Sequence, residues 1–207
     1  MRLLCVKEIL LPTSKVDCAA AMPRFNVYET PLFGLKLIVR KVVGDERGFL
    51  SRLFCANELA SVGWHKPVIQ INHTLTKNRG AVRGMHFQKA PYTEMKLVSC
   101  LHGAVWDVAV DLRAGSPTFL HWHAEELSRD NRRALLIPEG FAHGFQSLTD
   151  NCELIYLHSS QYAVDSEEGF NPKDPGLNIC WPQAITDLSA RDRAHSLKVG
   201  SFQGVAI

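Results

Sequence analysis

The chain has 207 residues, of which 46% are hydrophobic and 21% are charged. At roughly 150 residues per domain this length predicts one domain with at most a short appendage, and no apolar run approaches the roughly 18 residues of a membrane-spanning helix. The net charge of +2 is the difference between 23 basic and 21 acidic residues, which argues against the concentrated basic surface of a nucleic-acid-binding protein.

The first 23 residues are expected to form an extension outside the main fold. Residues 3–11 resemble the apolar part of a secretory signal, but Lys7 and Glu8 interrupt the run and leave it too short. The six cysteines are scattered and form no Cys-x-x-Cys pair, which is typical of a reduced cytosolic protein. We therefore predict a cytoplasmic protein with a single domain over residues 24–207.

From about residue 24 onwards the pattern is typical of β structure. Short runs rich in β-branched and aromatic residues alternate with turn-forming Gly, Pro, Asn and Asp. These strand-like runs are 35–43, 68–75, 96–101, 104–112, 134–138 and 153–159. Only 55–62 and 128–133 have a helical pattern, and both are short. The spacing predicts an all-β sandwich or closed barrel, less regular from about residue 172 onwards.

His121 and His123 could bind one metal ion together, because alternate residues of a strand point to the same face. With Gly115 they match the opening of the metal-binding motif of the cupins, which are small β-barrels. That motif requires a Glu after three or four further residues, where the chain has Leu127 and Ser128. We therefore predict that the histidine pair is a solvated strand end.

The second cupin motif, Pro-x-Gly-x-x-His, matches residues 138–143. Pro138 and Gly140 predict a hairpin turn, because glycine readily adopts the positive φ that such a turn needs. The turn would deliver His143 to the mouth of the barrel. The alternative is a histidine that packs in the core and hydrogen-bonds to the backbone.

Residues 79–88, Arg-Gly-Ala-Val-Arg-Gly-Met-His-Phe-Gln, are followed by Pro91 and by Lys96-Leu97-Val98. In this stretch the chain resembles the dTDP-4-dehydrorhamnose 3,5-epimerase family of nucleotide-sugar cupins. Further blocks agree in order and spacing: 44–49, 70–73, 107–113, 116–119, 138–145, 153–156, 174–175, 181–182 and 188–192. The resemblance covers about residues 24–195 and implies a cupin-type jelly roll with short helices and an irregular C-terminal segment.

The resemblance also implies an isomerase of deoxysugar (rhamnose-like) biosynthesis that acts on a nucleoside-diphospho-4-keto-6-deoxyhexose. The protons at C3 and C5 of such a sugar are weakly acidic because both carbons adjoin the C4 ketone. Epimerisation removes one of them, forms an enolate and returns a proton to the opposite face. No cofactor and no metal are expected, because a lysine supplies the positive charge near the enolate oxygen.

Four residues match the family's catalytic positions. By resemblance His86 is the base, Asp192 is the carboxylate that pairs with it, Tyr156 is the acid on the opposite face and Lys96 is the cation at the C4 oxygen. A histidine suits proton removal at neutral pH, and a carboxylate on one ring nitrogen fixes its tautomer. Implied substrate-binding residues are Arg47, Phe49, Arg52, Gln70, Asn72, Arg83, Gln88, His143 and Tyr162.

The chain departs from the family at the nucleotide end. Where the family carries an aromatic residue and then a Glu, this chain has Leu50, Ser51 and Arg52. The nucleoside (thymidine or cytidine) therefore stays open. The choice among C3, C5 or both also stays open, because each outcome uses the same acid and base. The strand that carries Arg47 is expected to cross into a partner subunit, which makes a homodimer with shared sites.

Two other functions stay open as alternatives. One is a non-catalytic cupin that binds a sugar nucleotide, and the other is a sugar-nucleotide 3,4-ketoisomerase. The presence of both His86 and Tyr156 favours an epimerase over a binding protein. The ketoisomerases lack the Arg-Gly-x-x-Arg-Gly-x-His run that this chain carries, which favours an epimerase again.

Overall fold

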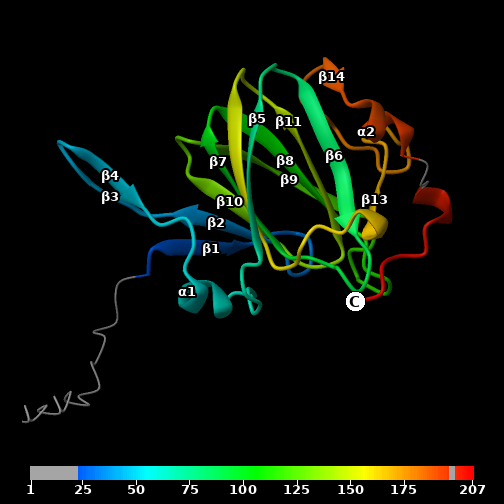
Figure 1. Ribbon diagram of the computed structural model, residues 1–207, viewed down its shortest axis with the longest axis horizontal. Helices are drawn as coiled ribbons and strands as arrows, with labels where there is room; N and C mark the ends of the chain where they lie inside the picture. Colours follow the sequence, from blue (N-terminus) through cyan, green and yellow to red (C-terminus); the bar gives the residue numbers. More distant parts are fainter. Residues whose placement is uncertain (1–22, 196–198) are drawn as a thin grey trace, which may run out of the picture.

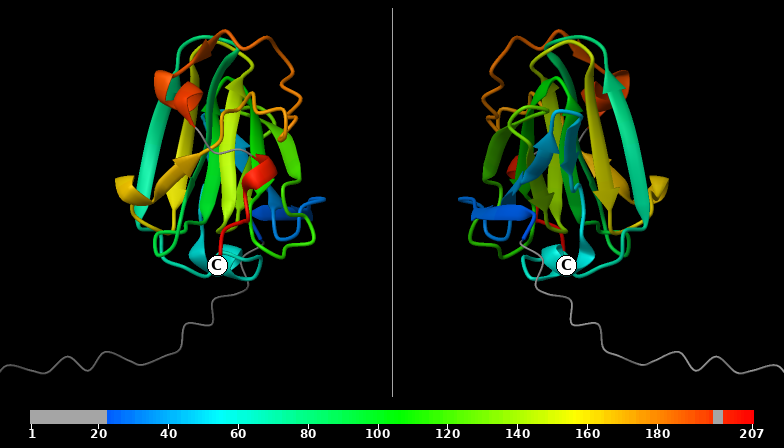
Figure 2. Two further views of the ribbon diagram at one scale, coloured as in Figure 1. Left: turned by 90° about the vertical axis from the view of Figure 1, so that its right-hand side faces the viewer. Right: turned by 90° about the vertical axis from the view of Figure 1, so that its left-hand side faces the viewer.

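The computed structural model describes residues 23–195 and 199–207, which form a sandwich of two facing β-sheets (Figures 1 and 2). The first sheet has the strand order β1 (Phe25–Glu29), β2 (Lys36–Arg40), β10 (Arg133–Ile137), β7 (Lys96–His102), β12 (Cys152–His158) and β5 (Gln70–Thr76). The second has the order β13 (Glu167–Gly169), β6 (Ala81–Gln88), β11 (Phe141–Ser147), β8 (Ala104–Asp111) and β9 (Trp122–Ser128), and β14 (Asp187–Leu188) also pairs with β6.

The remaining elements are short. They are the hairpin β3 (Val42–Asp45) and β4 (Gly48–Ser51), the α-helices α1 (Ala56–Ala60) and α2 (Ala190–Ala194), and the 3-10 turns η1 (Val164–Ser166) and η2 (Val199–Ser201). None of the helices in the described residues is long and apolar enough to cross a membrane. The all-β sandwich with an irregular C-terminal segment is thus confirmed.

The core follows from the alternation of side chains along the strands. On β10, Leu135 and Ile137 pack between the two sheets, whereas Leu136 packs on the outer face of the first sheet with Leu59 of α1. The C-terminal segment covers the outer face of the second sheet, where Phe170 is completely buried. Burying each such side chain contributes roughly 1.5–3 kcal/mol. Apolar packing therefore stabilises each sheet on its outer face as well as on the face between the two sheets.

The hairpin of β3 and β4 projects from the body of the sandwich (Figure 1). Phe49 and Leu50 at its end are more than half exposed, with relative accessibilities of 61% and 63%. Large apolar side chains that stand together in solvent are typical of a surface that another molecule covers.

Two sequence predictions need a correction or a limit. The helical pattern at 128–133 is wrong, because these residues form the end of β9 and a tight turn into β10. There the backbone N–H of Ser128 donates to Asn131 Oδ1, the N–H of Asn131 donates to Ser128 Oγ, and Arg132 has a φ of 56°. These hydrogen bonds between side chain and backbone take the place of the backbone hydrogen bonds that a helix would form. The predicted extension, by contrast, lies almost wholly outside the described residues.

Candidate active site

A cavity of about 260 Å³ lies between the two sheets. One wall comes from β5, β7 and β12 of the first sheet, and the other comes from β6 and β11 of the second. Most of the predicted site residues line it: Gln70, Asn72, Arg83, His86, Gln88, Lys96, His143, Tyr156 and Tyr162. Segments far apart in the sequence thus meet in one place.

Strand alternation explains how His86 reaches this cavity. Its neighbours Met85 and Phe87 pack into the cluster on the outer face of the second sheet, so His86 points inward. On the adjacent strand β11, His143 lies directly opposite His86 in the antiparallel register. Tyr156 comes from β12 in the other sheet. The histidine and the phenol therefore stand on opposite walls.

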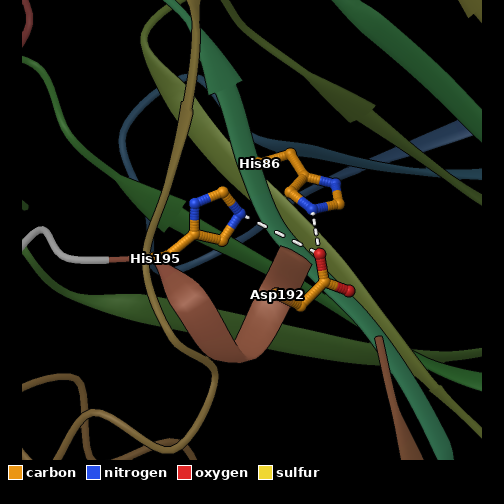
Figure 3. A group of neighbouring side chains, drawn as sticks. All are labelled: His86, Asp192 and His195. Carbon is orange, nitrogen blue, oxygen red and sulfur yellow. Dashed lines mark hydrogen bonds and ion pairs between the residues drawn. The ribbon is translucent and has the colours of Figure 1, made fainter. Parts of the chain in front are cut away.

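His86 is paired with the predicted carboxylate. Its Nε2 lies 2.7 Å from Asp192 Oδ1 (Figure 3). Asp192 lies in the first turn of α2, where its backbone N–H donates to the N-cap Ser189, and such a cap holds the start of a short helix. With the proton on Nε2 donated to Asp192, Nδ1 is the ring nitrogen of His86 that can accept a proton.

The environment keeps Asp192 ionised. Burial by itself would raise the pKa of this carboxyl, but the hydrogen bonds from His86 and from the backbone N–H of Gly84 outweigh it and lower the pKa. The carboxylate is thus a fixed negative charge behind the imidazole at neutral pH. It orients the ring and stabilises the imidazolium that forms when His86 takes a proton.

A second histidine, His195, faces the same carboxylate oxygen at 3.9 Å (Figure 3). Its Nε2 has no hydrogen-bond partner in the described part of the chain, and burial together with the nearby His86 lowers its pKa. With His86 and Asp192 it forms a group whose donor atoms lie within 4.8 Å of one another and could hold a metal ion. However, Arg191 Nη2 lies 3.3 Å from His86 Nε2, and this positive charge opposes a cation there.

Of the other histidines in the sequence prediction, His121 and His123 lie away from the cavity and His143 lines it. His121 is exposed just before β9, and His123 Nε2 lies 3.0 Å from Glu125 Oε1. Gly140 has a φ of 76°, as the predicted turn requires, and His143 Nε2 lies 2.8 Å from the buried Asp107 Oδ1. His143 is therefore buried but paired with a carboxylate rather than with the backbone.

Tyr156 and Lys96 line the wall opposite His86. Burial raises the pKa of the Tyr156 phenol, so the hydroxyl keeps its proton at neutral pH. The ring of His143 meets the Tyr156 ring edge-on at 5.9 Å. Lys96 Nζ lies 3.1 Å from Glu94 Oε1 and 3.5 Å from the carbonyl oxygen of His86. The cavity thus holds a base, a protonated phenol and an ammonium group.

Among the cavity residues that the sequence prediction missed are Glu94 and His158. Glu94 Oε2 lies 2.7 Å from His158 Nδ1. Burial by itself would raise the pKa of Glu94, but Lys96 and His158 lower it to about 2. Their positions carried a signal, because Glu94 is two residues before Lys96 and His158 is two residues after Tyr156. In extended chain such residues point to the same face.

Gln88 and Tyr162 line the cavity but have partners within the chain. Gln88 donates to the carbonyl oxygens of Tyr92 and Gln161 and accepts from the N–H of Ala163. The Tyr162 hydroxyl donates to Glu167 at 2.8 Å. Through these hydrogen bonds Gln88 holds the loop that follows β12, and this loop forms part of the rim of the cavity.

Arg47, Phe49 and Arg52 do not line the cavity of their own chain. Arg47 lies on the projecting hairpin, where its side chain is 89% exposed and pairs with Asp45 at 2.5 Å. Arg52 pairs with Glu58 of α1. The expectation that these residues hold the nucleotide therefore depends on a second subunit.

Comparison with known proteins gives consistent similarities. A sequence model of the family described as dTDP-4-dehydrorhamnose 3,5-epimerase matches residues 29–198. The dTDP-4-dehydrorhamnose 3,5-epimerase of Shigella flexneri is 42% identical over 168 residues, which are 81% of this chain and 92% of that protein. A dTDP-4-dehydrorhamnose 3-epimerase of Streptomyces niveus is 46% identical over 115 residues, which are 56% of each chain.

A solved structure agrees with these sequences. The dTDP-6-deoxy-D-glucose-3,5-epimerase of Legionella pneumophila, in complex with dTDP-4-keto-L-rhamnose, superposes with a TM-score of 0.79 at 39% identity. The match covers 83% of this chain and 91% of that one.

Proposed function

Because the chain belongs to the dTDP-4-dehydrorhamnose 3,5-epimerase family, it is an isomerase acting on a nucleotide sugar, and we propose that the cavity between the sheets is its active site. The substrate is a nucleoside-diphospho-4-keto-6-deoxyhexose of the dTDP-4-dehydro-6-deoxyglucose type. The observation that carries the proposal is that His86, which pairs with the buried Asp192, lines a cavity together with Lys96 and Tyr156.

In the proposed mechanism His86 Nδ1 removes the proton from C3 or C5. Asp192 stabilises the resulting imidazolium, and the Lys96 ammonium stabilises the negative charge that develops on the C4 oxygen. Because Tyr156 lies on the opposite wall, its phenol can protonate the other face of the enolate. Burial keeps that phenol protonated until the enolate is available to accept the proton.

Deuterium wash-in tests this proposal directly. The wild-type protein in D₂O is expected to exchange the C3 proton, the C5 proton or both in a nucleoside-diphospho-4-keto-6-deoxysugar, as monitored by NMR. A panel of thymidine and cytidine diphosphosugars identifies the nucleoside and the exchanged carbons together. A non-catalytic cupin would bind such compounds without exchange, and that result would overturn the proposal.

We also expect full activity after exhaustive treatment with a chelator. Lys96 supplies the positive charge at the C4 oxygen, and Arg191 opposes a cation beside His86. The measurement is wash-in by the chelated protein, with its metal content determined on the same sample. Activity that falls on chelation and returns with a divalent metal would contradict this expectation.

For the assembly we propose a two-fold homodimer in which the hairpin of β3 and β4 reaches the cavity of the partner. The exposed Phe49 and Leu50 and the projection of the hairpin support it. A two-fold arrangement is the commonest oligomer geometry. Arg47 would then bind the diphosphate, to which a guanidinium can donate two hydrogen bonds at once. We propose a cytoplasmic location on the grounds of the scattered cysteines.

Arg47→Ala is expected to raise KM about 10- to 100-fold with a smaller effect on kcat, since a hydrogen bond to a charged group contributes roughly 1.5–3 kcal/mol. Such a bond is made in both the ground state and the transition state. Steady-state kinetics measure the effect, sedimentation gives the oligomeric state, and Lys173→Ala is a control that removes an exposed charge away from the cavity. A fully active monomer would exclude the shared site.

A further inference from the structure

Strand register brings an ammonium, an imidazole and a carboxylate together on one wall of the cavity. Lys96 on β7 lies directly opposite His158 on β12. Glu94 lies just before β7, two residues from Lys96, and the three side chains are each about nine-tenths buried, with exposures of 9%, 11% and 10% for Lys96, His158 and Glu94. The pairing of His158 with Glu94 is separate from those of His86 with Asp192 and of His143 with Asp107.

The hydrogen bonds of this cluster are consistent in direction. Gln70 Nε2 donates to Asn72 Oδ1 at 3.1 Å, and Asn72 Nδ2 lies 3.3 Å from His158 Nε2. An amide nitrogen can only donate, so Nε2 of His158 accepts and the ring proton lies on Nδ1. That proton is donated to Glu94 Oε2. Glu94 therefore has one oxygen held by His158 and the other free to bind Lys96.

The contacts of Lys96 leave one of its N–H groups for a ligand. An ammonium has three donors, of which one faces Glu94 Oε1 and another faces the carbonyl oxygen of His86. The His158 ring is itself held in place, since it stacks on Tyr156 with a centroid separation of 6.1 Å. The ammonium is thus fixed from two sides next to the proposed base.

We propose that Glu94 and His158 are positioning residues that hold the Lys96 ammonium at the C4 oxygen of the sugar. The inference rests on the role of Lys96 in the proposed function. Lysine has a flexible four-carbon stem, and the diphosphate of the substrate would attract its charge towards the nucleotide end. The Glu94 carboxylate opposes that displacement, and His158 keeps the carboxylate in place.

Glu94→Gln tests the proposal, because glutamine keeps the size and one acceptor oxygen but removes the negative charge. We expect kcat and wash-in to fall together by about 10- to 100-fold, since a misplacement of about 1 Å in an active site can cost about 10²-fold in rate. The Kd for dTDP is expected to stay unchanged or to fall, since the pocket loses a charge that repels the diphosphate. A general disruption of the pocket would instead weaken dTDP binding.

Glu153→Gln is the matched control. Glu153 pairs with His73 at 2.9 Å on exposed parts of the same strands β12 and β5, and we expect its variant to retain wild-type kcat. A double-mutant cycle with Lys96→Met then tests whether Glu94 acts on the reaction through Lys96. If Glu94 acts through Lys96, adding Glu94→Gln to Lys96→Met changes wash-in by less than about twofold.

Two results would overturn the inference: wild-type kcat in Glu94→Gln, or a full further loss when it is added to Lys96→Met. If Glu94→Gln does not fold, His158→Phe serves in its place, since it removes the donor to Glu94 but keeps a ring against Tyr156. It is expected to lower kcat with unchanged dTDP affinity, and wild-type kcat in this variant would equally overturn the inference. A wild-type protein without wash-in would instead contradict the proposed function.

Discussion

Replacing His86 with alanine is expected to abolish solvent exchange at every carbon that the enzyme epimerises. One base serves each position, because His86 lines the cavity and is the imidazole that pairs with Asp192. General-base catalysis contributes about 10²–10⁴-fold, so wash-in is expected to fall by about that factor. NMR in D₂O with a single nucleotide sugar measures the loss at C3 and C5 separately.

The fold is expected to survive this change. His86 is about one-quarter exposed, with a side-chain accessibility of 24%, and its neighbours Met85 and Phe87 supply the packing of β6. Circular dichroism and dTDP binding check this, with His102→Ala as an exposed-histidine control. Exchange above a few per cent of the wild-type rate in a folded variant would show that another group is the base.

Tyr156→Phe is expected to impair inversion far more than exchange. Without the phenol nothing protonates the far face of the enolate, but His86 can still remove a proton and return a deuteron on its own side. The variant should therefore show wash-in with retained configuration, while inversion falls by about 10²–10⁴-fold, the usual contribution of a general acid. Comparing deuterium content with product configuration in one sample separates the two processes.

This expectation depends on the two walls of the cavity. His86 comes from the second sheet and Tyr156 from the first, so a sugar between them has one face towards each. The Tyr156 ring remains as phenylalanine and can keep its contacts with His143 and His158. Loss of exchange and inversion by the same factor would argue that Tyr156 is not the donor to the opposite face.

Local patterns in the sequence were sufficient for the fold class, and the family resemblance indicated most of the predicted residues that line the cavity. Strand residues such as those of β7, β8 and β10 form apolar runs between turn residues, and this signal depends only on near neighbours. The motif around His86 and the turn at Gly140 are also local. Strand β6 itself was harder to predict, because Arg83, Gly84, His86 and Gln88 interrupt its apolar pattern. Three of these residues, Arg83, His86 and Gln88, line the cavity instead of packing in the core.

Other features were decided only by the tertiary structure. The contact of Glu94 with His158 joins residues 64 positions apart, and it follows from the register of β7 against β12, which no local pattern encodes. The turn at 128–133 has helix-compatible residues, but Ser128 and Asn131 bond to each other's backbone and the flanking strands pair instead.

The physical reason is the range of the interactions. Alternation and turn chemistry act over a few residues, so the sequence by itself determined that the chain forms an all-β sandwich, and the family resemblance indicated which residues carry the chemistry. The resemblance also indicated that Asp192 pairs with His86. The wall that each side chain occupies and the pairing of Arg52 with Glu58 depend on strand pairing and sheet stacking. Those contacts join distant segments, and only the folded chain brings them together.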